Sequence, residues 1–321
     1  MNQADYAYGV AYIRSIENRL LDKGDIEALI MAKSPSEAVR MLIDKGYGNE
    51  MISPSEYETL LSNQQKLCWQ TVREVAPKNA PLDILLYQND FHNLKVVLKS
   101  VFTDNKNIEA LFLSPAAVST DIIIDALNEK DFSALPEMLR EPARMAYESY
   151  AGTEDIQKSD IIIDKASMDY MMKAAKDSKN DFIISFVKLK NALADIKIAY
   201  RAMKTEKDKS FLSSALSEDS GFNRDSFILS ALSGEDALLA FVSSNGYENA
   251  ANALKASMAE FEKYADNALT EYIEKARYIT FGVEPLLAYI LKKQAELLSV
   301  RIIMSGKLNG FSEQSIRERL R

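Results

Sequence analysis

One short pattern occurs three times in this chain, and it constrains the fold more than any other feature. A polar residue is followed by an aliphatic and a basic residue in Asn93–Lys95, Asp195–Lys197 and Ser299–Arg301. The first members of these triplets lie 102 and 104 residues apart. Because a repeat of about a hundred residues is longer than a solenoid unit, the pattern predicts three similar modules that form a ring or funnel.

The residues around each triplet share a helical pattern. Apolar side chains recur there at spacings of three and four, which is typical of one buried face of a helix. They are Leu94, Val97 and Leu98 in the first copy, Ile196, Ala199 and Tyr200 in the second, and Val300, Ile303 and Met304 in the third. We therefore expect an all-α fold with modules at residues 1–105, 106–205 and 206–321, packed as one assembly.

Helix starts and a second repeat support this interpretation. The tetrapeptide Ser-Pro-Ser-Glu occurs at Ser34–Glu37 and at Ser53–Glu56. Serine suits the N-cap, proline the first helical position, and glutamate can bond back to the cap. Ser114–Pro115 predicts a third start of this kind. In addition, similar apolar segments end at Gly46–Tyr47 and Gly246–Tyr247.

Composition indicates a soluble, helical, intracellular protein. The 321 residues are 47% hydrophobic, with only 11 Gly and 8 Pro. A formal net charge of -8 argues against a nucleic-acid partner, since such binding relies on Lys and Arg. No apolar run reaches the roughly 18 residues that a membrane span needs, and the first residues do not resemble a secretory signal.

The residue inventory argues against several enzyme classes. His92 and Cys68 are the single histidine and the single cysteine, so the common zinc patterns cannot be assembled and a histidine-dependent triad would have to use His92. Neither common glycine-rich phosphate loop occurs. We therefore expect no cofactor and no catalytic residue. His92 with Asp90 as its orienting partner is a possible acid–base pair, but a packing or surface histidine is the plainer interpretation.

Two carboxylate pairs are the best enzymatic alternative. Asp121 with Asp125, and Asp160 with Asp164, place two carboxylates four residues apart on one helical face. Some all-helical enzymes hold magnesium and a diphosphate in this way. Aspartate near a helix start also caps the helix, so structural capping is the competing interpretation.

Basic residues border the apolar face in each copy. They are Lys95, Lys99, Lys197, Arg201, Arg301 and Lys307. If the modules surround a pore, these side chains could form a basic collar for an acidic partner. The alternative is that their aliphatic stems cover the edge of the core. Together with Asn93 and Asp195 they are our candidates for partner contact or for the repeat signature.

Three segments resemble a known family. Tyr8–Leu21, Asp90–Lys95 and Phe281–Lys293 are similar to the opening helix, the acidic Asn-Leu-Lys motif and the Phe-Gly-x-x-Pro segment of the C subunit of the bacterial and archaeal V-type and A-type ATPases. The eukaryotic counterpart is the d subunit. Glu296, Arg301, Gly306–Lys307 and Ile316–Arg317 also agree, whereas Gln294 stands where the family pattern has Glu.

The resemblance implies a function as well as a fold. It implies an all-helical funnel of three modules on the cytoplasmic face of a rotary ATPase. Such a protein is part of the rotor and is not a catalyst. It couples the central shaft of the soluble head to the membrane ring of ion-carrying subunits. An unrelated helical scaffold and a magnesium-dependent helical enzyme remain the alternatives.

Overall fold

Helices make up all the regular secondary structure of the residues described by the computed structural model, which are 3–103 and 107–320. The expected all-α class is confirmed. The two triple-isoleucine stretches are helical as well, because Ile122–Ile124 lies in α6 (Thr120–Glu129) and Ile161–Ile163 in α8 (Ile156–Asp177). No helix within the described ranges is long and apolar enough to cross a membrane.

The chain divides into two compact units. Unit 1 combines Met1–Ala80 with Asp266–Arg321, and unit 2 is Pro81–Ala265. The boundary on the C-terminal side falls within α14 (Met258–Glu274). The three-module division stays a prediction.

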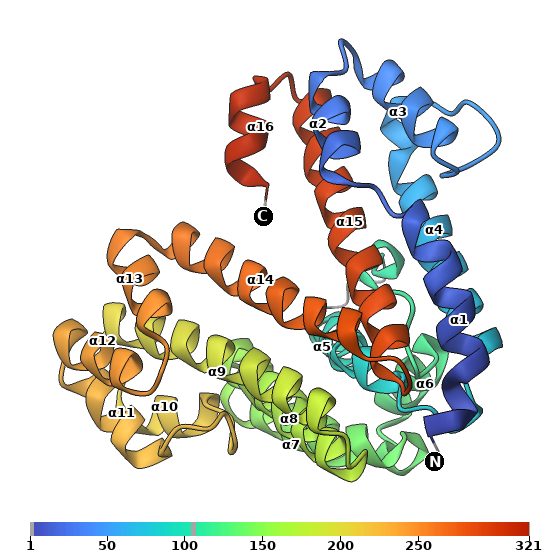
Figure 1. Ribbon diagram of the computed structural model, residues 1–321. Helices are drawn as coiled ribbons and strands as arrows, with labels where there is room; N and C mark the ends of the chain where they lie inside the picture. Colours follow the sequence, from blue (N-terminus) through green and yellow to red (C-terminus); the bar gives the residue numbers. More distant parts are fainter. Residues whose placement is uncertain (1–2, 104–106, 321) are drawn as a thin grey trace. The chain divides into compact units, whose positions relative to one another are not determined.

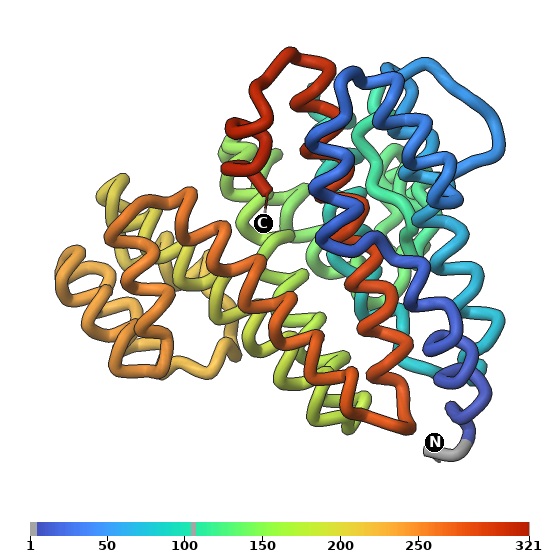
Figure 2. The backbone as a smooth tube through the Cα atoms, turned by 45° about the horizontal axis from the view of Figure 1, so that its top comes forward, coloured from blue at the N-terminus to red at the C-terminus, as the bar shows by residue number. Residues whose placement is uncertain are grey.

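Unit 1 joins the two ends of the chain. Its centre is the long helix α15 (Glu284–Leu308), which packs against α1 (Ala7–Ile16) and α4 (Tyr57–Val75), as Figure 1 shows. Figure 2 shows the same return of the C-terminal helix to the N-terminal segments. The remaining elements are η1 (Gln3–Tyr6), η2 (Glu17–Arg19), α2 (Lys23–Met31), α3 (Pro35–Asp44), η3 (Pro54–Glu56), η7 (Lys275–Tyr278) and α16 (Glu313–Arg319).

Unit 2 is built around three long helices. They are α5 (Tyr87–Thr103), α8, and α9 (Asp181–Lys204), and α8 packs against both of the others and against α7 (Glu137–Thr153). The shorter elements are η4 (Asp83–Leu85), η5 (Glu109–Leu111), α6, η6 (Phe132–Ala134), α10 (Lys209–Ala215), α11 (Arg224–Leu232), α12 (Glu235–Ser244) and α13 (Glu248–Ala256).

The predicted apolar faces are buried in all three repeated helices. Leu94, Val97 and Leu98 of α5 belong to the core of unit 2, and Val300, Ile303 and Met304 of α15 belong to the core of unit 1. Ile196 and Ala199 of α9 are also fully buried. Tyr200 is only half-buried, and its hydroxyl donates to Glu235 at 3.1 Å.

The predicted helix starts have different outcomes. Ser34 caps α3 by accepting from the Glu37 N–H at 3.1 Å, although the Glu37 carboxylate accepts from Lys33 and not from the cap. At the second tetrapeptide the Glu56 carboxylate does accept from the Ser53 N–H at 3.3 Å, and the short η3 turn leads into α4. The prediction at Ser114–Pro115 is wrong, because α6 begins at Thr120 with Ser119 as its N-cap.

The Gly-Tyr repeat corresponds to one turn used twice. Gly46 lies just after the end of α3 with φ +87°, and Gly246 lies just after the end of α12 with φ +90°. In both turns the tyrosine after the glycine donates its N–H to the carbonyl five residues earlier. Tyr47 donates to Leu42 at 3.0 Å, and Tyr247 donates to Val242 at 3.1 Å. Glycine suits this left-handed conformation because it has no Cβ. The repeated Gly-Tyr pair therefore marks the same helix-ending turn at both places.

Candidate functional site

The polar residues of the first two repeat triplets are buried and hold the chain that follows. Asn93 is fully buried in α5, and its side-chain amide bonds both backbone groups of Leu113, at 2.8 and 3.0 Å. Asp195 in α9 is 1% exposed and accepts from the Ser217 N–H and hydroxyl at 3.0 and 2.6 Å. These two matched positions perform the same task, which is to satisfy the backbone of a downstream segment inside the protein.

Two neighbours of Asn93 explain why no helix starts at Ser114–Pro115. The Asn89 side chain donates to the Pro115 carbonyl at 2.7 Å. One carboxylate oxygen of Asp90 accepts from the N–H groups of Ala117 and Val118, both at 2.9 Å. Side chains of α5 thus satisfy backbone groups that a helix would otherwise have satisfied. The segment stays irregular until Ser119.

Burial makes Asp90 and Asp195 hold their protons more tightly than ordinary aspartates. Desolvation raises the pKa of Asp90 to about 6, against the opposing effect of its two backbone bonds. Its second oxygen is buried and has no hydrogen-bond partner among the described residues. Desolvation also raises the pKa of Asp195, opposed by its bonds to serine side chains and the Ser217 N–H.

The basic residues of the first two copies pair with acids on later helices of unit 2. Lys95 bonds Asp164 at 2.6 Å, and Lys99 bonds Asp160 at 2.7 Å. In the second copy, Lys197 and Arg201 both contact Glu262 of α14, at 2.5 and 3.3 Å. Lys99 and Arg201 lie the same 61 residues before their partners. The ion pairs therefore repeat together with the helices.

The basic residues of the third copy make different contacts, within unit 1. Arg301 forms a two-bond fork with Glu58 of α4, at 2.8 and 2.9 Å. Lys307 donates to the carbonyls of Ile30 and Ala32 at 2.7 and 2.6 Å, so it caps the C-terminal end of α2. Ser299, the polar member of the third triplet, is only partly buried and bonds only the Ala295 carbonyl of its own helix among the described residues.

A buried polar cluster in unit 1 was missed at the level of sequence. The Lys293 and Glu296 side chains, 8% and 5% exposed, form an ion pair at 2.5 Å within α15. Glu296 also accepts from the Tyr47 hydroxyl and from the Leu21 N–H. Burial, with the nearby Glu296 carboxylate, raises the pKa of Tyr47. The sequence pattern could have predicted this burial, because Lys293 and Glu296 lie on the same helix face as the apolar residues Leu297 and Val300.

The carboxylates of the enzymatic alternative are not brought together. Asp160 and Asp164 are ion-paired with Lys99 and Lys95, while Asp121 lies in the exposed first turn of α6. No group of three or more potential metal-ligating side chains occurs in the part of the chain that the structure describes. The possible pairing of His92 with Asp90 does not form among the described residues. His92 bonds the Leu111 carbonyl at 3.1 Å, and Asp90 accepts from the N–H groups of Ala117 and Val118.

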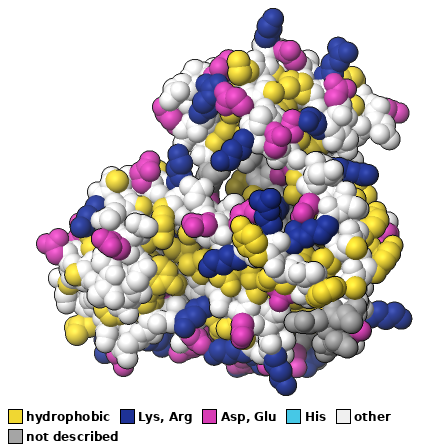
Figure 3. All heavy atoms as spheres, in the orientation of Figure 1, with side chains coloured by type: hydrophobic (Ala, Val, Ile, Leu, Met, Phe, Trp, Pro, Cys, Tyr) yellow, Lys and Arg dark blue, Asp and Glu magenta, His cyan; other side chains and the backbone are white. Residues whose placement is uncertain are grey.

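Positively and negatively charged side chains are mixed on the surface. On the face drawn in Figure 3, Lys and Arg side chains lie scattered among Asp and Glu side chains. Each of the six basic candidates contacts a carboxylate or a carbonyl of its own unit. These contacts fix one helix against the next. They hold the repeated helices in place within each unit.

Comparison with known proteins gives this arrangement its context. The chain matches the family described as ATP synthase (C/AC39) subunit over residues 10–319. It belongs to this family. The match covers both units and all three repeated helices, so the predicted resemblance to the C subunit is confirmed.

Relatives over the full length carry the same subunit name. The chain is 24% identical to the V-type sodium ATPase C subunit of Enterococcus hirae over 96% of both chains. It is 23% identical to the A-type ATP synthase C subunit of Methanocaldococcus jannaschii, over 99% of this chain and 86% of that one. It is 21% identical to the V-type ATP synthase C subunit of Thermus thermophilus, over 98% of both.

Proposed function

We propose that this chain is a non-catalytic rotor subunit that couples the central shaft of a V/A-type ATPase to its membrane ring. The observation that carries the proposal is the family match over residues 10–319. It agrees with full-length relatives that are named as the C subunit of V-type and A-type enzymes. In this proposal the chain serves proton or sodium transport from the cytoplasmic, inner face of the membrane.

The internal contacts suit a part that must transmit torque. A coupling element has to resist twisting, and packed helices joined by side-chain bonds deform little. Asn93 and Asp195 hold downstream backbone segments, while Lys99 and Arg201 bind acids 61 residues further on. We assign the eight candidate residues to this stiffening role. They are Asn93, Lys95, Lys99, Asp195, Lys197, Arg201, Arg301 and Lys307.

The proposed arrangement is a funnel of three modules, at residues 1–105, 106–205 and 206–321. One face would receive the shaft and the other would rest on the membrane ring. A wide adaptor is needed because a thin shaft must turn a broader ring without slipping. Interfaces of permanent assemblies often exceed about 2,000 Å², so both faces should bury extensive surface.

The test is co-purification followed by a coupling assay. The tagged chain is isolated from gently solubilised membranes, and mass spectrometry identifies what accompanies it. We expect shaft and membrane-ring subunits. In vesicles containing ATPase assembled without this chain, ATP hydrolysis by the head should continue while ATP-driven ion uptake is lost. Adding the chain back should restore uptake.

A matched pair of variants separates the rotor from the enzymatic alternative. Asp121→Asn and Asp160→Asn remove one carboxylate from each pair. In a rotor subunit they change only stability or assembly. Loss of a magnesium-dependent activity of the isolated chain, or recovery of no ATPase subunit while the ATPase itself stays intact, would overturn the proposal.

A further inference from the structure

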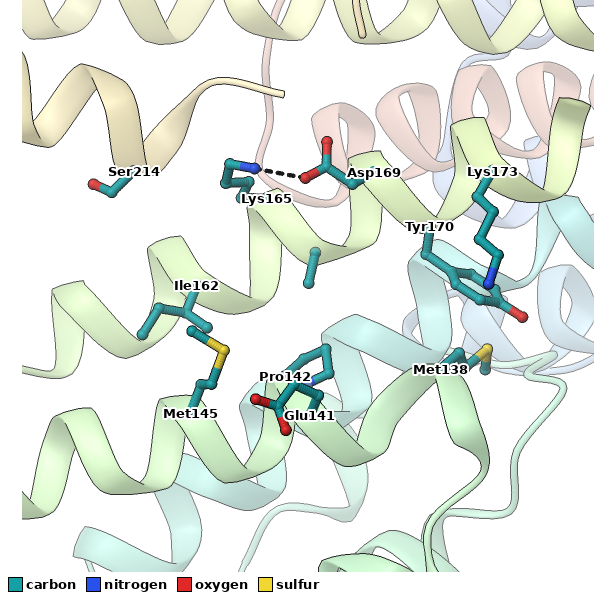
Figure 4. Close-up of a pocket in the computed structure, with 11 residues that line it drawn as sticks. Met138, Glu141, Pro142, Met145, Ile162, Lys165, Asp169, Tyr170, Lys173 and Ser214 are labelled. Atoms are coloured by element: carbon teal, nitrogen blue, oxygen red, sulfur yellow. Dashed lines mark hydrogen bonds and ion pairs between the residues drawn. The ribbon is translucent and has the colours of Figure 1, made fainter. Parts of the chain in front are cut away.

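A cavity of about 580 Å³ opens between α7, α8 and α10 of unit 2 (Figure 4). Its walls are mainly apolar, with Met138, Pro142 and Met145 from α7 facing Ile162 from α8. Ala166 of α8 also lines it. Ser214 of α10 lies at one end, and Tyr170 and Lys173 lie at the other. The volume falls within the roughly 300–1,000 Å³ of small-ligand sites.

Four charged side chains line this cavity, and three of them are neutralised by the protein. Lys165 bonds Asp169 at 2.7 Å and Glu218 at 2.6 Å. Asp169 also accepts from the Glu218 N–H at 2.7 Å. Glu141 is paired with Arg144 on its own helix, and this pairing lowers the pKa of Glu141. The protein thus balances the charges of these three groups.

Lys173 is the exception. Its amine makes no hydrogen bond or ion pair with any residue that the structure describes. In Figure 4 it projects toward the end of the cavity that holds Tyr170 and Met138. Lys173 is exposed, so one end of the apolar cavity carries a solvent-accessible positive charge that no described side chain pairs with.

We propose that this cavity binds a single-headed anionic amphiphile, that is, an apolar chain with one carboxylate. The chain would lie between α7 and α8, and the carboxylate would bond the Lys173 ammonium. Such a charge-assisted bond is stronger than a neutral one. Methionine side chains adapt readily to an apolar chain, because they are unbranched and have three rotatable bonds.

The experiment is a calorimetric titration of the purified chain with decanoate, below the concentration at which decanoate aggregates. We expect saturable binding of one decanoate per chain. Decanol offers the apolar chain without the charge, and butyrate offers the charge with little apolar chain. Both should bind at least about fivefold more weakly, because each lacks one of the two contacts.

Three variants locate the site. Lys173→Gln should weaken decanoate binding by roughly fivefold to tenfold and leave decanol binding unchanged. Lys176→Gln is the matched control, since Lys176 lies on the same helix but pairs with Asp219 and does not line the cavity. Ala166→Phe should fill the cavity and abolish binding, with an unchanged circular dichroism spectrum showing that the chain still folds.

The outcomes that overturn the proposal are distinct from those that test the rotor function. The proposal fails if no saturable binding occurs, or if decanol binds as tightly as decanoate. It also fails if Lys173→Gln binds decanoate as well as the unmodified chain, or if Lys176→Gln loses as much affinity as Lys173→Gln. None of these outcomes bears on assembly with ATPase subunits.

Discussion

The two units bury acidic side chains in different ways. In unit 2, Asp90 is fully buried, and its bonds come from the N–H groups of Ala117 and Val118. In unit 1, Glu296 is also buried but has the Lys293 ammonium at 2.5 Å. The same offset that relates the outer two repeat triplets relates Asp90 to Glu296. Backbone N–H groups therefore stabilise the buried carboxylate of unit 2, whereas a buried lysine stabilises that of unit 1.

This difference has consequences for stability. Burial raises the pKa of an acid that has no cation beside it, so the stability it contributes depends on pH. The stability contributed by an acid paired with a buried lysine depends instead on keeping that lysine. Four predictions test this comparison between the units, from the largest expected effect to the smallest.

Removing the buried cation of unit 1 should have the largest effect. Lys293→Met leaves Glu296 buried with only the Tyr47 hydroxyl and the Leu21 N–H as donors. We expect the free energy of unfolding, measured by urea titration, to fall by about 3 kcal/mol. The control is Lys292→Met, whose partner Glu274 is half exposed. A loss equal to that of the control would show that the buried ion pair contributes no more than an exposed one.

The buried acid of unit 2 should make stability depend on pH. The pKa of Asp90 is raised to about 6 from its usual 3.8, so the folded state holds this proton more tightly than the unfolded state. The resulting stability is fully present below about pH 4 and is lost as pH rises through about 6. Asp90→Asn should therefore gain stability relative to the unmodified chain between pH 4 and pH 8, by on the order of 2 kcal/mol.

The measurement is a urea titration of both proteins at pH 4 and at pH 8. Asp195 contributes in the same direction to both proteins, because its pKa is also raised, so it cancels in the difference. An Asp90→Asn difference that is the same at both pH values would mean that folding does not raise the pKa of Asp90. The contrast between the two units would then disappear.

The repeated glycine turn should respond equally in both units. Gly46→Ala in unit 1 and Gly246→Ala in unit 2 each place a Cβ at a positive φ, with no neighbouring atom within 4 Å. Each should lower the free energy of unfolding by about 1 kcal/mol through backbone strain alone. Gly152→Ala is the control, since Gly152 lies inside α7. This substitution should slightly raise the free energy of unfolding, because alanine favours the helix more than glycine does. Unequal losses would show that the two turns are not equivalent.

The three repeated helices could be predicted from the sequence because their apolar positions recur, and the structure buries these positions. The partners of the ion pairs could not be predicted in the same way. Lys99 and Asp160 lie 61 residues apart and meet only after α5 and α8 have packed together. A signal was nevertheless present, since Asp160 and Glu262 differ by the same 102 positions as Lys99 and Arg201.

The start predicted at Ser114–Pro115 failed for a different reason. Local patterns describe what a segment prefers alone, whereas Asn89, Asp90 and Asn93 satisfy that backbone from another helix. The Lys293–Glu296 pair was equally hidden, because charged residues in a helix normally face water. In both regions the decisive contacts are polar, buried and distant in sequence, and periodicity does not report on such contacts.

The smallest expected effect compares one exposed ion pair from each unit. Arg301 and Glu58 in unit 1 form a fork of two bonds, whereas Lys99 and Asp160 in unit 2 share one bond at 2.7 Å. Double-mutant cycles with Arg301→Met and Glu58→Gln should give a coupling of about 0.5–1 kcal/mol, and those with Lys99→Met and Asp160→Asn less than about 0.5 kcal/mol. Both couplings should weaken with added salt, because both pairs are partly exposed. A larger coupling for Lys99 would mean that the repeated pairs of unit 2 carry more of the stability than the fork in unit 1.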